Sequence, residues 1–385
     1  MTPASFALFA LAAAATLTIA VPGRGPAGVF EFASLATLAA VAWRRRHWKW
    51  NIPCAALSAV PLIGLAQLAL GTTVSPWLTA NATLQWASWA AAAWLAAQAL
   101  DERHVRIRFL EWFAGFTAIL AAACLAQPAL GISYDDFAGP FQNRNTWASM
   151  VELALPAAVW LAIHEKQRQW MWWPAAAMMA ASVVATGSRA GAIIVVIEFA
   201  LLMIAASGRP KAAAATAGLA FALAAMTGWE TLAWRMRLGD PLAHRREFVM
   251  SSVRMMAERP ISGFGLGTFA EAYPRFAIAD FGRTVNHLHN DWLEWSVDGG
   301  IALPLLVALA LLSVTGSVRR HWWAAGIAAV ALHALADYPF ARSGLSVWIW
   351  ILAASAVRQP SFARARSGAR ESVVPAGRSL ATARR

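Results

Sequence analysis

Residues 190–206 have the sequence AGAIIVVIEFALLMIAA, seventeen residues in which Glu198 is the only charged side chain. A helix of this length and composition can cross a hydrocarbon layer of about 30 Å. Similar apolar stretches recur along nearly the whole chain of 385 residues, of which 59% are hydrophobic and only 14% are charged. Soluble domains carry about 25% charged residues. The sequence therefore predicts an all-α polytopic membrane protein and argues against a soluble enzyme.

Breaks rich in charged residues, Pro and Gly divide these stretches into about twelve predicted spans. The first, at residues 6–20, has no basic residue before it, so we interpret it as a retained helix rather than a cleaved signal peptide. The predicted spans are centred near residues 13, 35, 61, 90, 118, 155, 178, 198, 219, 303, 330 and 350.

The distribution of Lys and Arg predicts the orientation, because basic residues in short loops are retained on the cytoplasmic side. With both termini in the cytoplasm, the short outer loops hold only Arg24, Arg144, Arg189 and Arg342. The short inner loops then hold thirteen basic residues: Arg44, Arg45, Arg46, Lys49, Arg103, Arg106, Arg108, Lys166, Arg168, Arg209, Lys211, Arg319 and Arg320. The tail at residues 358–385 adds seven arginines and is predicted to be a disordered cytoplasmic segment near anionic lipid.

The net charge of +12 would suggest nucleic-acid binding in a soluble protein. Here the excess of basic residues lies mainly in the predicted loops between spans. We therefore expect membrane lipids as partners and no nucleic acid. Cys54 and Cys124 both lie in apolar segments. Neither a disulfide framework nor a zinc site is therefore predicted.

One long outer segment interrupts the predicted spans. With the basic tail, it gives the chain four parts. These are nine helices at residues 1–228, an outer loop at 229–291, three further helices at 292–357 and the basic tail at 358–385. Within the loop, residues 241–258 show helical spacing of apolar side chains and predict an amphipathic helix along the membrane surface. The loop is basic, which indicates an anionic ligand on that side; its arginines are Arg235, Arg237, Arg245, Arg246, Arg254, Arg259, Arg275 and Arg283.

Outward arginines are the first candidate binding residues. Arg144 lies in the motif GPFQNRN at residues 139–145 with Asn143, Arg189 lies in TGSRAG at 186–191, and Arg245 and Arg246 open the loop helix. A guanidinium can hold phosphate oxygens with two parallel hydrogen bonds, so several together would suit a lipid pyrophosphate. The alternative is that each one reaches lipid headgroups or caps a neighbouring carbonyl.

The second candidate is the motif VNHLHNDWLE at residues 285–294. His287 and His289 place imidazoles, which can exchange protons near neutral pH, beside Asn290, Asp291 and Glu294 at the outer interface. Asp291 or Glu294 would be expected to orient the base. Metal binding by these side chains and a purely structural role are the alternatives.

Two further features carry open alternatives. The motif PISGFGLGTF at residues 260–269 lacks the strand and helix of a dinucleotide loop, so it is either a glycine turn whose amides closely approach another group or a simple hinge. His333 and Asp337 are four residues apart near the outer end of the eleventh predicted helix. Ionisable side chains within a membrane helix are functional candidates, and a mutual hydrogen bond that locks the bundle is the alternative.

Together these motifs resemble the O-antigen ligase superfamily of bacterial membrane glycosyltransferases, which includes O-antigen polymerases and protein O-oligosaccharyltransferases. The resemblance covers about residues 135–340, with five motifs in the expected order. It implies a fold like that of the C-type glycosyltransferases. It also implies transfer of a glycan from undecaprenyl pyrophosphate to an acceptor hydroxyl at the periplasmic face of the inner membrane, with lipid A-core as the expected acceptor.

The resemblance also implies roles for individual residues. Arg189 matches the arginine that holds the donor pyrophosphate, and Arg245 matches the second one, with Arg246 as the alternative. His289 matches the most recurrent histidine and His287 its companion. Departures occur at Val249 and Asp298, where many members carry Trp and Glu; the full set of expected site residues is His289, His287, Arg189, Arg245, Arg246, Arg144, Asn143 and Asn290.

The chemistry of such a transfer requires fixed positive charge at the leaving group and a base for the acceptor proton. Arginines can supply that charge, so no metal or other cofactor is expected, and a single attack would invert the anomeric centre. A polymerase or a protein transferase would differ only in its acceptor. A lipid-linked glycan transporter is the alternative from another class, although transporters generally place polar features near the bilayer midplane and show repeated halves.

Overall fold

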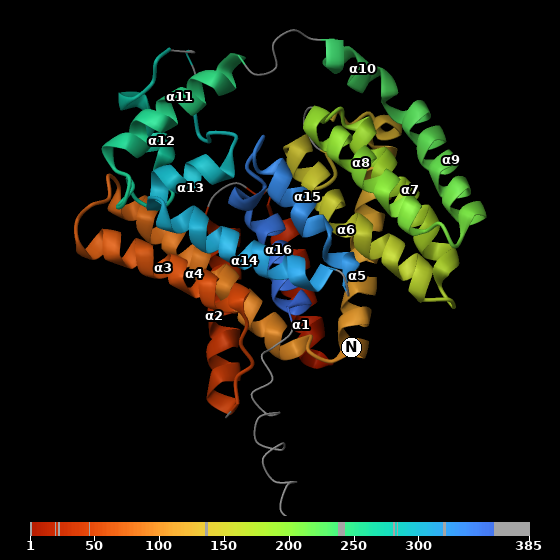
Figure 1. Cartoon of the computed structure of the whole chain (residues 1–385), viewed down its shortest axis with the longest axis horizontal. Coiled ribbons are helices and arrows are strands. Elements are labelled where there is room, and N and C mark those ends of the chain that lie inside the picture. The colour runs from red at the N-terminus through yellow and green to blue at the C-terminus, as the bar shows by residue number, and fades with distance from the viewer. Residues whose placement is uncertain are drawn as a thin grey trace, which may run out of the picture.

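All regular structure in the described part of the chain is helical (Figure 1). The structure is a computed structural model that describes residues 2–19, 21, 24–45, 47–134, 138–237, 243–279, 282, 284–318 and 321–357, with only the main chain at 243 and 244. Its elements are α1 (Pro3–Leu17), α2 (Gly25–Arg44), α3 (Ile52–Ala69), α4 (Pro76–Ala99), α5 (Arg103–Ala126), η1 (Gln127–Leu130), α6 (Arg144–His164), α7 (Gln169–Ala185), α8 (Arg189–Ala205), α9 (Pro210–Thr227), α10 (Trp229–Arg237), α11 (Ala243–Glu258), α12 (Phe269–Ala272), η2 (Tyr273–Arg275), α13 (Asp291–Gly299), α14 (Ala302–Val318), η3 (Trp322–Ala324), α15 (Gly326–His333), η4 (Pro339–Ala341) and α16 (Ser343–Ala356).

Every predicted span centre falls within one of these helices, which confirms the all-α fold. Among the described residues, four helical segments are long and apolar enough to cross a membrane: Gly25–Arg44, Ile52–Ala69, Arg103–Leu130 and Arg144–His164. A fifth candidate is α9 with α10, which are bent by 74° relative to one another. Other apolar helices, including α1, α14 and α16, are shorter. The count of twelve spans therefore stays a prediction.

The helices α6 and α16 form the centre of the molecule (Figure 1). In the apolar 18-residue stretch of α6, 94% of the residues are buried within the protein, against 17% in that of α2. On α16, Trp348 is fully buried and its ring contacts those of Phe9, Phe109 and Phe113. Both helices are thus enclosed by the rest of the described protein.

Two glycines mark breaks in helices that hydropathy alone joins. At Gly228, between α9 and α10, a Cβ atom would lie 2.5 Å from the carbonyl oxygen of Ala185. At Gly300, where φ is +64°, a Cβ would lie 2.1 Å from the Ile261 carbonyl oxygen. The predicted tenth span therefore does not begin at the histidine motif as one continuous helix. It consists of a short α13 and a separate α14, because this close packing and left-handed turn require glycine.

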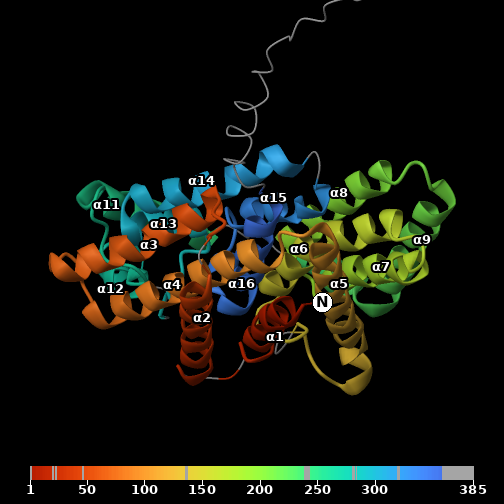
Figure 2. The same ribbon diagram turned by 90° about the horizontal axis from the view of Figure 1, so that it is seen from below.

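The described part of the loop from residue 243 onward contains the expected helix, at Ala243–Glu258, and packs with α13 around a small core, whereas α10 packs against α7, α8 and α9. That core includes Phe248, Met255, Phe264, Tyr273 and Leu288. Both views place α11, α12 and α13 beside α3 and α4, at the opposite end of the molecule from α9 (Figures 1 and 2). The position of this unit relative to a membrane stays a prediction. Arg283 and the tail at 358–385 lie outside the described residues, as do Arg46, Arg319 and Arg320.

Three contacts join segments that the prediction places on the same side of the membrane. Among the predicted inner loops, Lys49 pairs with Asp101 at 2.5 Å and the Arg168 guanidinium with Glu111 at 3.4 Å. Among the predicted outer segments, Ser188 donates to the Asn145 side chain at 2.7 Å. The orientation of these segments across a membrane stays a prediction.

We expect a cysteine introduced at the exposed Ala279 to react with a membrane-impermeant maleimide in spheroplasts. Ser207→Cys, in the predicted inner loop between α8 and α9, is the matched control and is expected to react only after permeabilisation. The native Cys54 and Cys124 are buried free thiols, so their background labelling should be low. Reaction at residue 279 only after permeabilisation would contradict the orientation.

Candidate active site

The histidine motif forms a tight turn immediately before α13. Leu288 is buried in the small loop core, and its main-chain N–H donates to Glu294 Oε2 at 2.8 Å. The Asn290 side chain caps α13 by accepting from the Leu293 N–H at 3.1 Å. Between them, His289 has a φ of +59°, the only positive value at a non-glycine residue in the described part of the chain. A non-glycine residue in this region is strained, which indicates that the surrounding contacts hold His289 in place.

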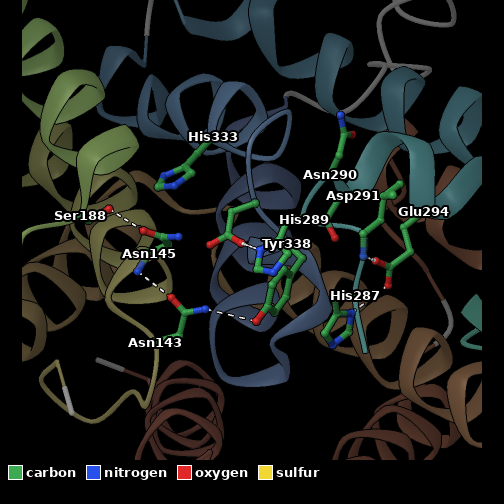
Figure 3. A network of polar contacts seen from close by, with 12 residues as sticks. Asn143, Asn145, Ser188, His287, His289, Asn290, Asp291, Glu294, His333 and Tyr338 are labelled. Carbon is green, nitrogen blue, oxygen red and sulfur yellow. Dashed lines mark hydrogen bonds and ion pairs between the residues drawn. The ribbon is translucent and has the colours of Figure 1, made fainter. Parts of the chain in front are cut away.

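His289 is paired with a carboxylate from a distant part of the chain. Its Nδ1 lies 2.8 Å from Oδ1 of Asp337, in the turn after α15 (Figure 3). Asp337 is only 3% exposed, and burial disfavours its charge, but the hydrogen bond with His289 and the nearby imidazoles outweigh burial and lower the pKa of Asp337. With Nδ1 engaged, Nε2 is the nitrogen left for a substrate, and the His289 side chain is 35% exposed.

His287 has its own carboxylate and a stacked aromatic ring. Its Nδ1 lies 2.9 Å from Glu294 Oε1, and its ring stacks on that of Tyr338 at 4.2 Å between centroids. Asp291 serves neither histidine, because its Oδ2 accepts from the Phe340 N–H at 2.9 Å. The expectation that Asp291 or Glu294 orients His289 is therefore wrong; Glu294 orients His287.

A chain of hydrogen bonds joins the separate motifs into one site (Figure 3). Asn143 donates to the Tyr338 hydroxyl at 3.2 Å, and its side-chain oxygen accepts from the Asn145 N–H at 2.8 Å. Asn145 in turn accepts from the Ser188 hydroxyl at 2.7 Å. The Asn290 amide donates to the Leu335 carbonyl at 3.1 Å, which fixes the turn that carries Asp337 against α13.

The arginines occupy different positions around this chain. Arg189 begins α8, and its Nη1 donates to the Arg235 carbonyl at 3.4 Å. Burial lowers the pKa of the half-buried Arg245 guanidinium, while the nearby charge of Asp337 raises it and that of Arg189 lowers it. Arg245 therefore lies near both Arg189 and Asp337, whereas Arg246 is exposed. Arg144 lies at the start of α6, beside Asn143.

His333 and Asp337 do not form the mutual side-chain hydrogen bond that was one of the two alternatives. The helix α15 ends at His333, so Asp337 lies beyond it. His333 Nδ1 instead lies 2.7 Å from Oε1 of Glu152 on α6, and both side chains are fully buried. The charge of His333 still acts on Asp337. His333 thus belongs to a buried pair behind the site.

Removing one member of this pair should be strongly destabilising, because it leaves a buried polar group without its partner. For His333→Ala we expect a loss of about 3–5 kcal/mol of unfolding free energy. The double variant Glu152→Leu/His333→Leu removes both partners and should lose less. Thermal unfolding in detergent measures both, and an unchanged melting temperature for His333→Ala would refute the prediction.

The glycine motif contacts the protein itself rather than presenting free amides. The Gly265 N–H donates to the Asp298 carbonyl at 3.0 Å, and the Gly267 N–H to the Asp298 carboxylate at 2.8 Å. The Leu266 N–H donates to the Gln67 side chain at 2.9 Å. The motif is therefore a glycine turn whose amides closely approach α3 and α13, and not a simple hinge. It fixes the loop to these two helices.

Sequence reasoning did not name Tyr338, and it paired Asp337 with His333 rather than with His289; it also did not name Glu152, which lies in the buried pair behind the site. A carboxylate within an apolar segment was the available signal for Glu152. Within the described residues, no group of three or more His, Cys, Asp or Glu side chains is arranged to hold a metal ion.

The helical fold is typical of a membrane protein. A polar site that combines histidine–carboxylate pairs with arginines is typical of an enzyme. A family model described as O-antigen ligase matches residues 174–308, which supports a similarity of this part of the chain to the O-antigen ligase superfamily. The matched region runs from within α7 to within α14, so it includes Arg189, Arg245 and both histidines. No curated protein matches the chain. The family supports an O-antigen ligase- or polymerase-like membrane glycosyltransferase.

Proposed function

We propose that the protein is an O-antigen ligase-type enzyme of the bacterial inner membrane. It transfers a glycan from undecaprenyl pyrophosphate to a hydroxyl of lipid A-core at the periplasmic face. The single observation that carries this proposal is that the His289–Asp337 pair is joined through Asn145 to Ser188, the residue before Arg189, while the charge of Asp337 acts on Arg245. Fixed cations for a leaving group and a base for an acceptor thus meet in one place.

The reaction follows from this arrangement. The acceptor hydroxyl gives its proton to Nε2 of His289 as its oxygen bonds to the anomeric carbon of the glycan. Asp337 stabilises the imidazolium that forms, as in other histidine–carboxylate pairs. The bond between the anomeric carbon and the pyrophosphate oxygen breaks, and Arg189 and Arg245 hold the charge that develops on the leaving group. Attack from the opposite face inverts the anomeric carbon.

Purified protein in nanodiscs tests the proposal directly. With undecaprenyl-pyrophosphate-linked glycan and lipid A-core, we expect a ligated glycolipid that migrates more slowly in a gel, with undiminished yield in EDTA. Growing polysaccharide and acceptor peptide, tested separately, distinguish polymerase and protein transferase. Movement of the donor across vesicles without any ligated product would instead support a transporter.

A further inference from the structure

A second cationic feature lies beside the histidines and includes neither Arg189 nor Arg245. It is a pocket of about 400 Å³ between the start of α6 and the segment that leads into α16. Its polar lining includes Gln142, Asn143, Arg144, Tyr338 and Arg342. The volume falls within the range of small-molecule sites, and is large enough for a substituted sugar unit.

Tyr338 joins this pocket to the proposed catalytic residues. Its ring contacts those of both histidines, at 4.2 Å from His287 and 4.9 Å from His289 between centroids. Arg342 donates to the Tyr338 hydroxyl at 3.0 Å, and its Cζ lies 4.9 Å from the centre of the ring. A molecule held in the pocket would therefore have its neighbouring hydroxyl groups close to the histidines.

The chemistry of the lining favours an anion. Two guanidinium groups and the amides of Gln142 and Asn143 are hydrogen-bond donors, and none of the lining residues is acidic. The buried Nε of Arg342 has no hydrogen-bond partner among the described residues. Buried donors are nearly always paired in native proteins, so this atom has capacity for a ligand. Phosphate and carboxylate are the groups that a guanidinium binds best.

The two cationic features meet neighbouring residues of one turn. Asp337 influences the charge of Arg245, which lies with Arg189, whereas the next residue, Tyr338, lines the pocket. A transferase needs two substrates that reach one base from different directions. The donor has an assigned place at Arg189 and Arg245, so the pocket is available to the acceptor.

We propose that this pocket is the acceptor site and that Arg342 binds an anionic group, phosphate or carboxylate, on the acceptor saccharide. The inference rests on the proposed glycosyl transfer and adds the class of acceptor. The enzyme would thus select a negatively charged core oligosaccharide by its charge and present a nearby hydroxyl to His289.

The test is a cycle of two proteins and two acceptors in zwitterionic nanodiscs. Wild-type protein and Arg342→Ala are each assayed with lipid A-core and with the same acceptor after enzymatic removal of its phosphates. We expect kcat/KM of the wild type for the acceptor to fall about 10- to 100-fold on dephosphorylation, the range of one charge-assisted interaction. Arg342→Ala should be low with both acceptors, and Arg342→Lys should recover part of the preference. If wild type shows no phosphate preference, an acceptor with its carboxylates reduced to alcohols repeats the cycle.

A second variant avoids dependence on the packing of Arg342. Gln142 is exposed, so Gln142→Glu should fold normally and should weaken the charged acceptor only, by placing a like charge in the pocket. The control is Arg275→Ala, which removes an exposed loop arginine that pairs with Glu258. Donor KM should not change in any variant.

Several results would overturn the inference. Equal losses with charged and uncharged acceptors would make Arg342 only a positioning residue for Tyr338. A raised donor KM would assign the pocket to the donor, and an Arg342-dependent requirement for phosphatidylglycerol would assign it to a lipid headgroup. Absence of transfer by wild-type protein would instead refute the proposed function itself.

Discussion

Replacing His289 by Gln is expected to lower glycan transfer about 100-fold or more while donor affinity changes little. Glutamine keeps much of the size and hydrogen bonding of the side chain but cannot accept a proton. Asp337→Asn should have a comparable effect, because an amide neither stabilises the imidazolium nor holds the same tautomer at 2.8 Å from Nδ1. Turnover and donor binding, measured on the same preparations, separate the chemical step from binding.

The matched controls for this prediction are two other histidines. His287→Gln disturbs the pair with Glu294 and should have the smaller effect if His289 is the base. His104→Gln alters an exposed histidine in a predicted inner loop and should leave transfer unchanged. Near-normal turnover in both His287→Gln and His289→Gln would remove the histidines from the mechanism, and a larger loss in His287→Gln would exchange their roles.

Removing either donor arginine is expected to lower kcat/KM for the donor about 100-fold. One charge-assisted hydrogen bond contributes about 1.5–3 kcal/mol, and leaving-group charge makes the contribution larger in the transition state. Arg189→Lys and Arg245→Lys keep the charge but lose the bidentate grip, so they should fall between wild type and alanine. Binding of undecaprenyl-pyrophosphate-linked glycan and the rate of transfer are both measured.

The variant Arg246→Ala tests which of Arg245 and Arg246 in the loop helix binds the donor pyrophosphate. Arg245 is half-buried and near Asp337, whereas Arg246 is exposed, so the alanine variant of Arg246 should lose much less activity. Arg275→Ala provides the control for loss of an exposed charge. Well-expressed Arg189→Ala and Arg245→Ala proteins with normal transfer would exclude pyrophosphate binding by these residues.

Much of the site could be predicted because its motifs are local in the sequence. Arg189 follows a tight turn at the end of an apolar segment, and the spacing of His287 and His289 fixes them beside the start of α13. Their partners could not be predicted in the same way. His289 pairs with Asp337 across 48 residues, and His333 pairs with Glu152 across 181. No periodic pattern encodes which of several carboxylates reaches a given imidazole.

The sequence by itself determined that this is an all-α membrane protein, because long apolar runs with few charges can satisfy their main chain only as helices in lipid. It also determined which short polar segments could carry chemistry. Only the tertiary structure decided where the helices break, as at Gly300, and which segments meet. Those outcomes depend on close packing between distant residues, such as Gly300 against Ile261, and on burial of Asp337 against His289. The local amino-acid composition does not determine such contacts.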